Sequence, residues 1–313
     1  MTIEASDFIT NRIELEPRLL LCLNCKRGGG DVPFSGINEL AAEIENNPDL
    51  HITMTGAFDE IGARTEVFDK QSPAERRKDL HVLQRLGLCF ADTRTARDLL
   101  FRISRNIDSL KDICEKTNPY RKWDECPLAR KRFFIEGNKP LPPAQSPETM
   151  NEYKISSCRA LEETDHVVIR AHHLLCIVCY AGRDDNNTPL AVDNLLEAWV
   201  KFRENPDIMV TVVEGVRNCC ICPPCHSYDQ KRGICVAACH LRDRRKDLDL
   251  CFAIGIIPGE TYTARELYKR IHAQITNIGM ICGYVNKTIP EWDSCGGVES
   301  GAYERGLEIC RIE

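Results

Sequence analysis

An internal repeat is the feature that most constrains the fold of this chain. The run LLLCLNC at residues 19–25 returns as HLLCIVC at 173–179, and four further segments recur in the same order. These segments are 47–49 with 205–207, 76–80 with 244–248, 95–97 with 263–265, and 123–126 with 292–295. Five collinear matches with few insertions predict two copies of one domain, over residues 10–136 and 164–308.

Residues 137–163 join the two predicted copies. The stretch GNKPLPPAQSPETMNEYK at 137–154 contains four prolines and few apolar side chains. Such a composition is typical of an extended connection and not of a packed element. We therefore expect residues 137–163 to form a Pro-rich, extended linker.

Each copy has the pattern of a small α+β domain that is mostly helical. A short β-like run leads into a Cys-x-x-Cys turn, and an amphipathic helix follows that ends at Asn-Pro-Asp. A second β-like run precedes two further helices. Ser72, Pro73 and Glu75 predict the start of one of these helices and Gly87 predicts its end, while Thr263 predicts the start of the last helix in copy two.

Composition narrows the class of protein. The 313 residues are 43% hydrophobic and 28% charged, which is typical of a globular protein with two cores. The net charge of -6 argues against nucleic acid or an anionic membrane as partner, and no apolar run is long enough to span a bilayer. The N-terminus lacks the features of a secretory signal, so we expect a cytoplasmic protein. Its oligomeric state is not indicated.

The chain contains 18 cysteines, of which eight occupy matching positions in the two copies. In a reducing compartment, clustered thiols are more often metal ligands than disulfides. Four thiols complete a cubane iron–sulfur cluster or a tetrahedral zinc site, and a single Cys-x-x-Cys pair joined to two distant thiols favours the cluster. The two sets, called the tetrads, are Cys22, Cys25, Cys114 and Cys126 in copy one, and Cys176, Cys179, Cys282 and Cys295 in copy two.

A further group of cysteines, called the Cys block, lies between residues 219 and 239 in an insertion of copy two. Cys219, Cys222 and Cys225 have the Cys-x-x-Cys-x-x-Cys spacing typical of [4Fe–4S] binding in ferredoxins. This spacing predicts a third cluster. Its candidate fourth ligands are Cys235, with Cys220 and Cys239 as alternatives.

Other side chains are judged by comparing the copies. Cys89 and Cys251 each match an apolar residue in the other copy, so we expect both in the core. His172 and His173 precede the Cys-x-x-Cys pair in copy two alone, so the fold does not require them. They are candidates for catalytic proton donors or for hydrogen bonds beside a cluster, with histidines that only satisfy the helix N-terminus as the alternative. The recurrent Arg-Arg-Lys-Asp run at 76–79 and 244–247 is expected to be a solvated helix face, with a docking face for an acidic partner as the alternative.

The run at 169–176, Ile-Arg-Ala-His-His-Leu-Leu-Cys, followed by a strand, a cysteine block and a helical region, resembles a known family. It is an uncharacterised prokaryotic iron–sulfur-binding domain family with an Arg-x-His-His-x-Leu-Cys opening. The resemblance covers residues 166–260. It implies cluster ligation by Cys176 together with thiols of the Cys block, which partly conflicts with the tetrad that contains Cys176. Copy one lacks both histidines and the block, so it departs from the family pattern.

These observations support three hypotheses about function. The first is an iron–sulfur protein with two to three [4Fe–4S] clusters that transfers electrons to a partner redox enzyme. The second is an iron–sulfur enzyme with an open cluster site in copy two. The third is an interaction module stabilised by zinc in place of iron. The reaction, the substrate and the redox potentials cannot be predicted from this pattern.

Overall fold

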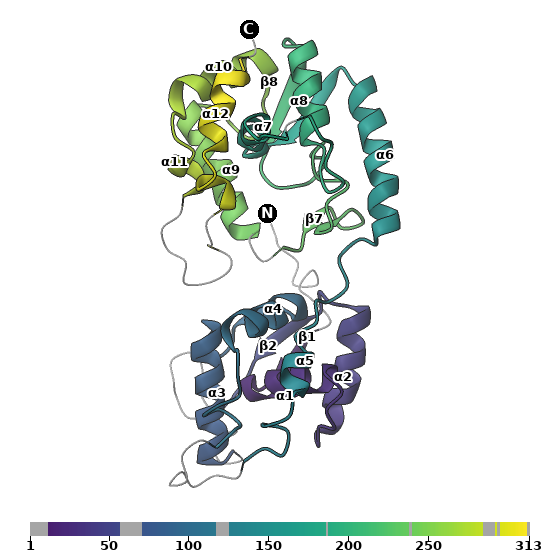
Figure 1. Ribbon diagram of the computed structural model, residues 1–313, viewed down its shortest axis with the longest axis vertical. Coiled ribbons are helices and arrows are strands. Elements are labelled where there is room, and N and C mark those ends of the chain that lie inside the picture. The colour runs from purple at the N-terminus through teal and green to yellow at the C-terminus, as the bar shows by residue number, and fades with distance from the viewer. Residues whose placement is uncertain are drawn as a thin grey trace, which may run out of the picture. The chain divides into compact units, whose positions relative to one another are not determined.

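The computed structural model describes residues 12–56, 71–116, 125–185, 187–237, 240–283, 292 and 295–311 (Figure 1). The chain divides into two compact units, which are residues 1–142 (unit 1) and 143–313 (unit 2). Each unit has its own hydrophobic core. Among the described residues, no helix is both long enough and apolar enough to cross a membrane.

Unit 1 is a three-stranded sheet covered by helices. Strand β1 pairs in parallel with β2, and β2 pairs antiparallel with β3. Helix α1 lies between α2 and α3 and contacts α5 (Figure 1). The elements are β1 (Arg12–Leu15), α1 (Pro17–Arg27), α2 (Ser35–Asn46), β2 (His51–Met54), α3 (Pro73–Leu86), β3 (Thr93–Thr95), α4 (Ala96–Asn106) and α5 (Phe133–Glu136).

Unit 2 has the same order of strand pairing, with β4 parallel to β5 and β5 antiparallel to β8. A two-stranded ribbon, β6–β7, lies in the Cys block. The elements are α6 (Pro147–Glu163), β4 (His166–Arg170), α7 (His173–Ala181), α8 (Leu195–Glu204), β5 (Met209–Val213), β6 (Tyr228–Asp229), β7 (Ile234–Cys235), α9 (His240–Ile254), β8 (Thr261–Thr263), α10 (Ala264–Gln274), α11 (Gly279–Cys282), the 3-10 helix η4 (Gly296–Val298) and α12 (Ala302–Ile309). Helices and small mixed sheets make the fold α+β, as the sequence predicts.

Helix boundaries follow the predicted capping residues. Ser72 and Glu75 form a reciprocal capping box at the start of α3, and Gly87 ends the helix in the left-handed conformation with φ 64°. The Thr263 hydroxyl accepts a hydrogen bond from the backbone N–H of Glu266 at the start of α10. The helices before each Asn-Pro-Asp end at Asn47 and Asn205.

Two glycine contacts hold the last helix of each unit against its Cys-x-x-Cys helix. A Cβ atom added at Gly137 would lie 1.8 Å from the backbone oxygen of Asn24, and one added at Gly306 would lie 1.9 Å from that of Val178. Only glycine permits an approach this close. In both units a glycine therefore allows the last helix to pack closely against the backbone of the Cys-x-x-Cys helix.

Three expectations are wrong. Residues 147–163 form helix α6 and not an extended linker, because Ser146 caps its N-terminus, Pro147 occupies its first turn, and Leu161 is buried in the core of unit 2. The Cys-x-x-Cys pairs lie on helices α1 and α7, not on turns. Cys251 is buried as expected, but Cys89 is exposed because it lies in the turn after α3.

Candidate metal centres

The structure brings the four cysteines of the unit 1 tetrad together. Cys22 and Cys25 lie one turn apart on α1, and the backbone N–H of Cys126 donates to the carbonyl of Cys114 at 3.2 Å. Burial first, and then the charges of the neighbouring thiolates, raises the pKa of Cys22 and of Cys25 to about 12. Burial likewise raises the pKa of Cys114 to about 11.

The unit 2 tetrad is assembled in the same way. Cys176 and Cys179 lie one turn apart on α7, Cys282 ends α11, and Cys295 precedes η4. Burial, followed by the other three thiols, raises the pKa of Cys176 well above its ordinary value. Burial and the charges of Cys282 and Cys295 raise that of Cys179 to about 12. The structure therefore groups Cys176 with the tetrad and not with the Cys block.

The donor groups of unit 2 and the tetrads differ in how closely their atoms lie. In tetrahedral zinc sites a Zn–S bond of about 2.3 Å places ligand sulfurs ~3.8 Å apart. Among the described residues, His173, Cys219 and Cys222 alone form a set of three donors that all lie within 4.8 Å of one another. Both tetrads are fully described, and in neither do three sulfurs all lie within 4.8 Å of one another.

A lysine accompanies each tetrad, and sequence reasoning missed it. Lys78 on α3 lowers the pKa of Cys114, although burial outweighs it. Lys246 on α9 likewise lowers the pKa of Cys176, Cys179 and Cys282, and burial again outweighs its effect. Lys246 is 2% exposed and pairs with Asp243 at 3.4 Å. The recurrent Arg-Arg-Lys-Asp run is therefore not simply a solvated face, and its recurrence in both copies was the signal for a buried role.

The aspartate that ends this run is buried in both units, but its partners differ. Asp247 accepts hydrogen bonds from Nε of Arg170 at 2.7 Å and from Nδ1 of His172 at 2.8 Å. Asp79 accepts from the backbone N–H and the guanidinium of Arg18, each at 2.8 Å. Burial lowers the pKa of His172 to about 4 against the opposing hydrogen bond to Asp247, so this imidazole is neutral at pH 7 and orients the start of α7.

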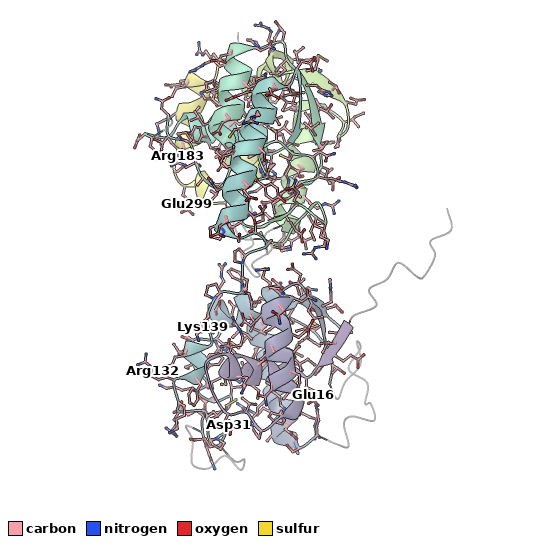
Figure 2. The ribbon with its side chains drawn as sticks, turned by 90° about the vertical axis from the view of Figure 1, so that its right-hand side faces the viewer. Glu16, Asp31, Arg132, Lys139, Arg183 and Glu299 are labelled. Carbon is pink, nitrogen blue, oxygen red and sulfur yellow. The ribbon has the colours of Figure 1, made fainter. Side chains whose placement is uncertain are left out.

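A cavity of about 890 Å³ lies beside the unit 2 tetrad. All four tetrad cysteines contribute to its lining, together with His172 and several charged side chains. Figure 2 places one of these, Arg183, at the outer surface of unit 2, where it pairs with Asp185 at 2.8 Å. The charged residues of the lining are Arg183, Asp184, Asp185, Arg242, Asp243, Lys246 and Arg305. The cavity is large enough for a small molecule.

The Cys block follows β5 as a series of tight turns. The N–H groups of Cys222 and Cys225 donate to the carbonyls of Cys219 and Cys222, at 3.3 and 2.9 Å. Cys220 contacts Cys219, and Cys235 lies near Cys225. The candidate ligand Cys239 lies outside the described residues.

His173 lies with this block and not with the tetrad. Its Nδ1 atom is 3.3 Å from Sγ of Cys219. In the sequence, His173 lies close to Cys176, which suggested a proton donor. The tertiary structure shows that its neighbour is Cys219, 46 residues away. His173 is thus a candidate ligand that sequence reasoning assigned to another role.

Comparison with protein-family models, with curated proteins and with solved structures finds no match to this chain. Its function is therefore inferred from the centres themselves.

Proposed function

We propose that this chain is an iron–sulfur protein that holds one [4Fe–4S] cluster in each tetrad and transfers electrons to a redox protein. The observation that carries the proposal is the assembly of two sets of four cysteines. In each set the four buried thiols act on one another electrostatically, and four thiolates are the number that a cubane cluster requires.

The donor chemistry of the tetrads supports a cluster. Four thiolates held together in a buried place repel one another, which is why burial and neighbouring thiolates raise their pKa values to about 11 or 12. A cationic centre bound among them removes this cost, and soft thiolate ligands suit iron–sulfur clusters. The described cysteines are all free thiols, so they are available for ligation.

We also propose that the two units arose by internal duplication. Support comes from the shared strand order, from the matching lysine and aspartate of α3 and α9, and from the paired glycine contacts. On this basis the domains are the predicted copies at 10–136 and 164–308. A duplicated centre would suit a protein that passes electrons between sites in one chain.

The proposed partner is a redox protein of the cytoplasm, where reduced thiols persist. Each tetrad has a lysine beside it. We expect these lysines to raise the reduction potential of the proposed cluster next to them and not to bind the partner. The described part of the surface carries no feature that assigns the partner further.

A second candidate function is an enzyme centred on the unit 2 tetrad. The specific observation in its favour is the cavity of about 890 Å³, to which all four tetrad cysteines contribute. A small substrate bound there would lie against the metal centre, whereas electron transfer alone needs no such space. The bound group would supply redox or Lewis-acid chemistry, and the charged lining would orient the substrate.

The test is the content of iron, acid-labile sulfide and zinc in protein purified without oxygen. Two clusters predict about eight irons and as many sulfides per chain, with the electron paramagnetic resonance of reduced cubanes. A colourless preparation with zinc and no sulfide would contradict both iron hypotheses and favour a zinc-stabilised interaction module. Binding of a small molecule that perturbs the spectrum of one cluster alone would favour the enzyme.

A further inference from the structure

Three donor atoms of unit 2 converge outside both tetrads. The Nδ1 atom of His173 and the Sγ atoms of Cys219 and Cys222 lie in a set whose members are all within 4.8 Å of one another. The closest pair, Nδ1 of His173 and Sγ of Cys219, is 3.3 Å apart. Both cysteines are buried and the histidine is half-buried.

Backbone hydrogen bonds fix the two segments that carry these donors. The N–H of Cys220 donates to the carbonyl of Val168 at 2.9 Å, which ties the Cys block to β4 immediately before α7. In addition, the side-chain NH₂ of Asn194 donates to the carbonyl of Cys220 at 2.8 Å. The three donors are therefore set by the scaffold and not by their own side-chain contacts alone.

A buried glutamine anchors the other end of the block. The side-chain NH₂ of Gln145 donates to the carbonyls of Pro223, Cys225 and Tyr228, at 2.9, 3.1 and 2.6 Å. Gln145 precedes α6, so three segments of unit 2 converge on the block. Such outer contacts are the support that metal ligands require.

We propose that His173, Cys219 and Cys222 bind a single zinc(II) ion at a site separate from the two tetrads. Donors that all lie within 4.8 Å of one another can reach one ion after small side-chain shifts toward the ~3.8 Å spacing of tetrahedral zinc, whereas in a cubane each ligand reaches a different iron. A mixed set of one imidazole and two thiolates suits zinc, a borderline-soft ion. This site replaces the third cluster that the Cys-x-x-Cys-x-x-Cys spacing predicts.

The surroundings of Cys219 agree with a ligand role. Its thiol is buried and contacts the thiols of Cys220 and Cys222 and the imidazole of His173. The backbone N–H of Arg170 also donates to its sulfur at 3.3 Å. Two thiols are available for the fourth position, Cys220 beside Cys219 and Cys225 beside Cys222.

The experiment measures zinc, iron and sulfide together in the full chain, with X-ray absorption at the zinc edge. We expect about one zinc per chain with both nitrogen and sulfur neighbours. The change His173→Ala should weaken zinc binding by more than about 100-fold, because it removes a direct ligand and loss of an outer contact alone costs 10- to 100-fold. The exposed His226, in the same block, supplies the matched control His226→Ala, which should keep the zinc.

A second variant guards against misfolding. His173→Cys retains a ligand, so Co(II) loaded in place of zinc should show stronger thiolate-to-metal charge-transfer absorption than in the parent chain. Cys220→Ser and Cys225→Ser then identify the fourth ligand by loss of one sulfur neighbour.

The possible outcomes separate this site from the proposed function. About twelve irons and no zinc would overturn the zinc site and leave the iron–sulfur proposal standing. About three zincs without sulfide would overturn the iron–sulfur proposal, and the zinc site would survive only if His173→Ala removed one of the three. Zinc that is unchanged by His173→Ala would overturn the site in either case.

Discussion

Unit 1 and unit 2 share one order of strand pairing and each brings four cysteines together, but the buried aspartate near these cysteines has different partners in the two units. In unit 1, Arg18 satisfies the buried Asp79 and also pairs with Glu16 and Glu75. In unit 2, Asp247 is satisfied by two groups, Arg170 and His172. The scaffold is therefore compatible with more than one way to stabilise a carboxylate at the start of its Cys-x-x-Cys helix.

The surroundings of the tetrads differ as well. The unit 2 tetrad lies against a cavity with a charged lining, and unit 2 also brings His173 of α7 close to Cys219 and Cys222 of the Cys block. A cavity described in unit 1 lies elsewhere, over β1 and α2. The two units therefore differ in what surrounds their four cysteines more than in how they hold them.

The largest expected effect tests whether the two tetrads are equivalent centres. Cys176→Ser and Cys22→Ser should each remove about four of eight irons, because a cubane loses stability when one of its four ligands is lost. Iron and sulfide analysis measures the effect, with the exposed Cys89→Ser as control. Loss of all iron from either variant would show that the centres are not independent.

A second pair of changes tests the shared packing of the scaffold. Gly137→Ala and Gly306→Ala place a methyl group less than 2 Å from a backbone oxygen, so each should lower the stability of its own unit by roughly 1–3 kcal/mol. Hydrogen exchange of peptides from α1 and α7 reports the two units separately. Gly36→Ala and Gly296→Ala, where an added Cβ meets nothing within 4 Å, are the matched controls.

The matched aspartates should give pH dependences of opposite sign. Burial raises the pKa of Asp79 to about 6, so its folded state binds the proton more tightly and unit 1 should lose stability as pH rises from about 4 to 6. Burial opposes ionisation of Asp247, but His172 and Arg170 hold its pKa below the ordinary value. Unit 2 should therefore lose stability as pH falls, from about 6.5 downward because its fold keeps His172 neutral with a pKa of about 4, and below about 4 because Asp247 becomes protonated.

Urea unfolding followed by hydrogen exchange across this pH range measures both slopes, each worth roughly 1.4 kcal/mol per unit of pKa difference. Asp79→Asn should reduce the slope of unit 1 and leave that of unit 2 unchanged. Asp247→Asn should reduce the slope of unit 2 below pH 4 and leave that of unit 1 unchanged. Equal slopes in the two units would refute the difference in their carboxylate environments.

The smallest expected effect concerns the lysines. Lys246→Met should lower the reduction potential of the unit 2 cluster by tens of millivolts, because a cation that favours added electrons is lost. Lys78→Met should shift the unit 1 cluster less, since Lys78 acts on Cys114 whereas Lys246 acts on three thiols of its tetrad. Spectroelectrochemical titration measures both shifts, with the exposed Arg245→Met as control.

The sequence predicts much of this arrangement because the repeat supplies an internal comparison. It predicts the α+β class, the capped helices and the grouping of the tetrads. It fails where the relevant contact is non-local, as for His173 and Cys219. It also fails for helix α6. The prolines at 140–143 predict an extended linker, although Ser146 and Pro147 form the N-terminal cap of a helix.

The position of each tetrad along the chain has a consequence for its synthesis. Cys25 and Cys179 lie on early helices, but Cys126 and Cys295 follow roughly 100 residues later. At ~5–20 residues per second, a ribosome needs about 5 to 20 s to complete each set of ligands. For that interval the first two thiols of a tetrad lack the other two, and the unit 1 tetrad is complete in the growing chain before any cysteine of the unit 2 tetrad has been made.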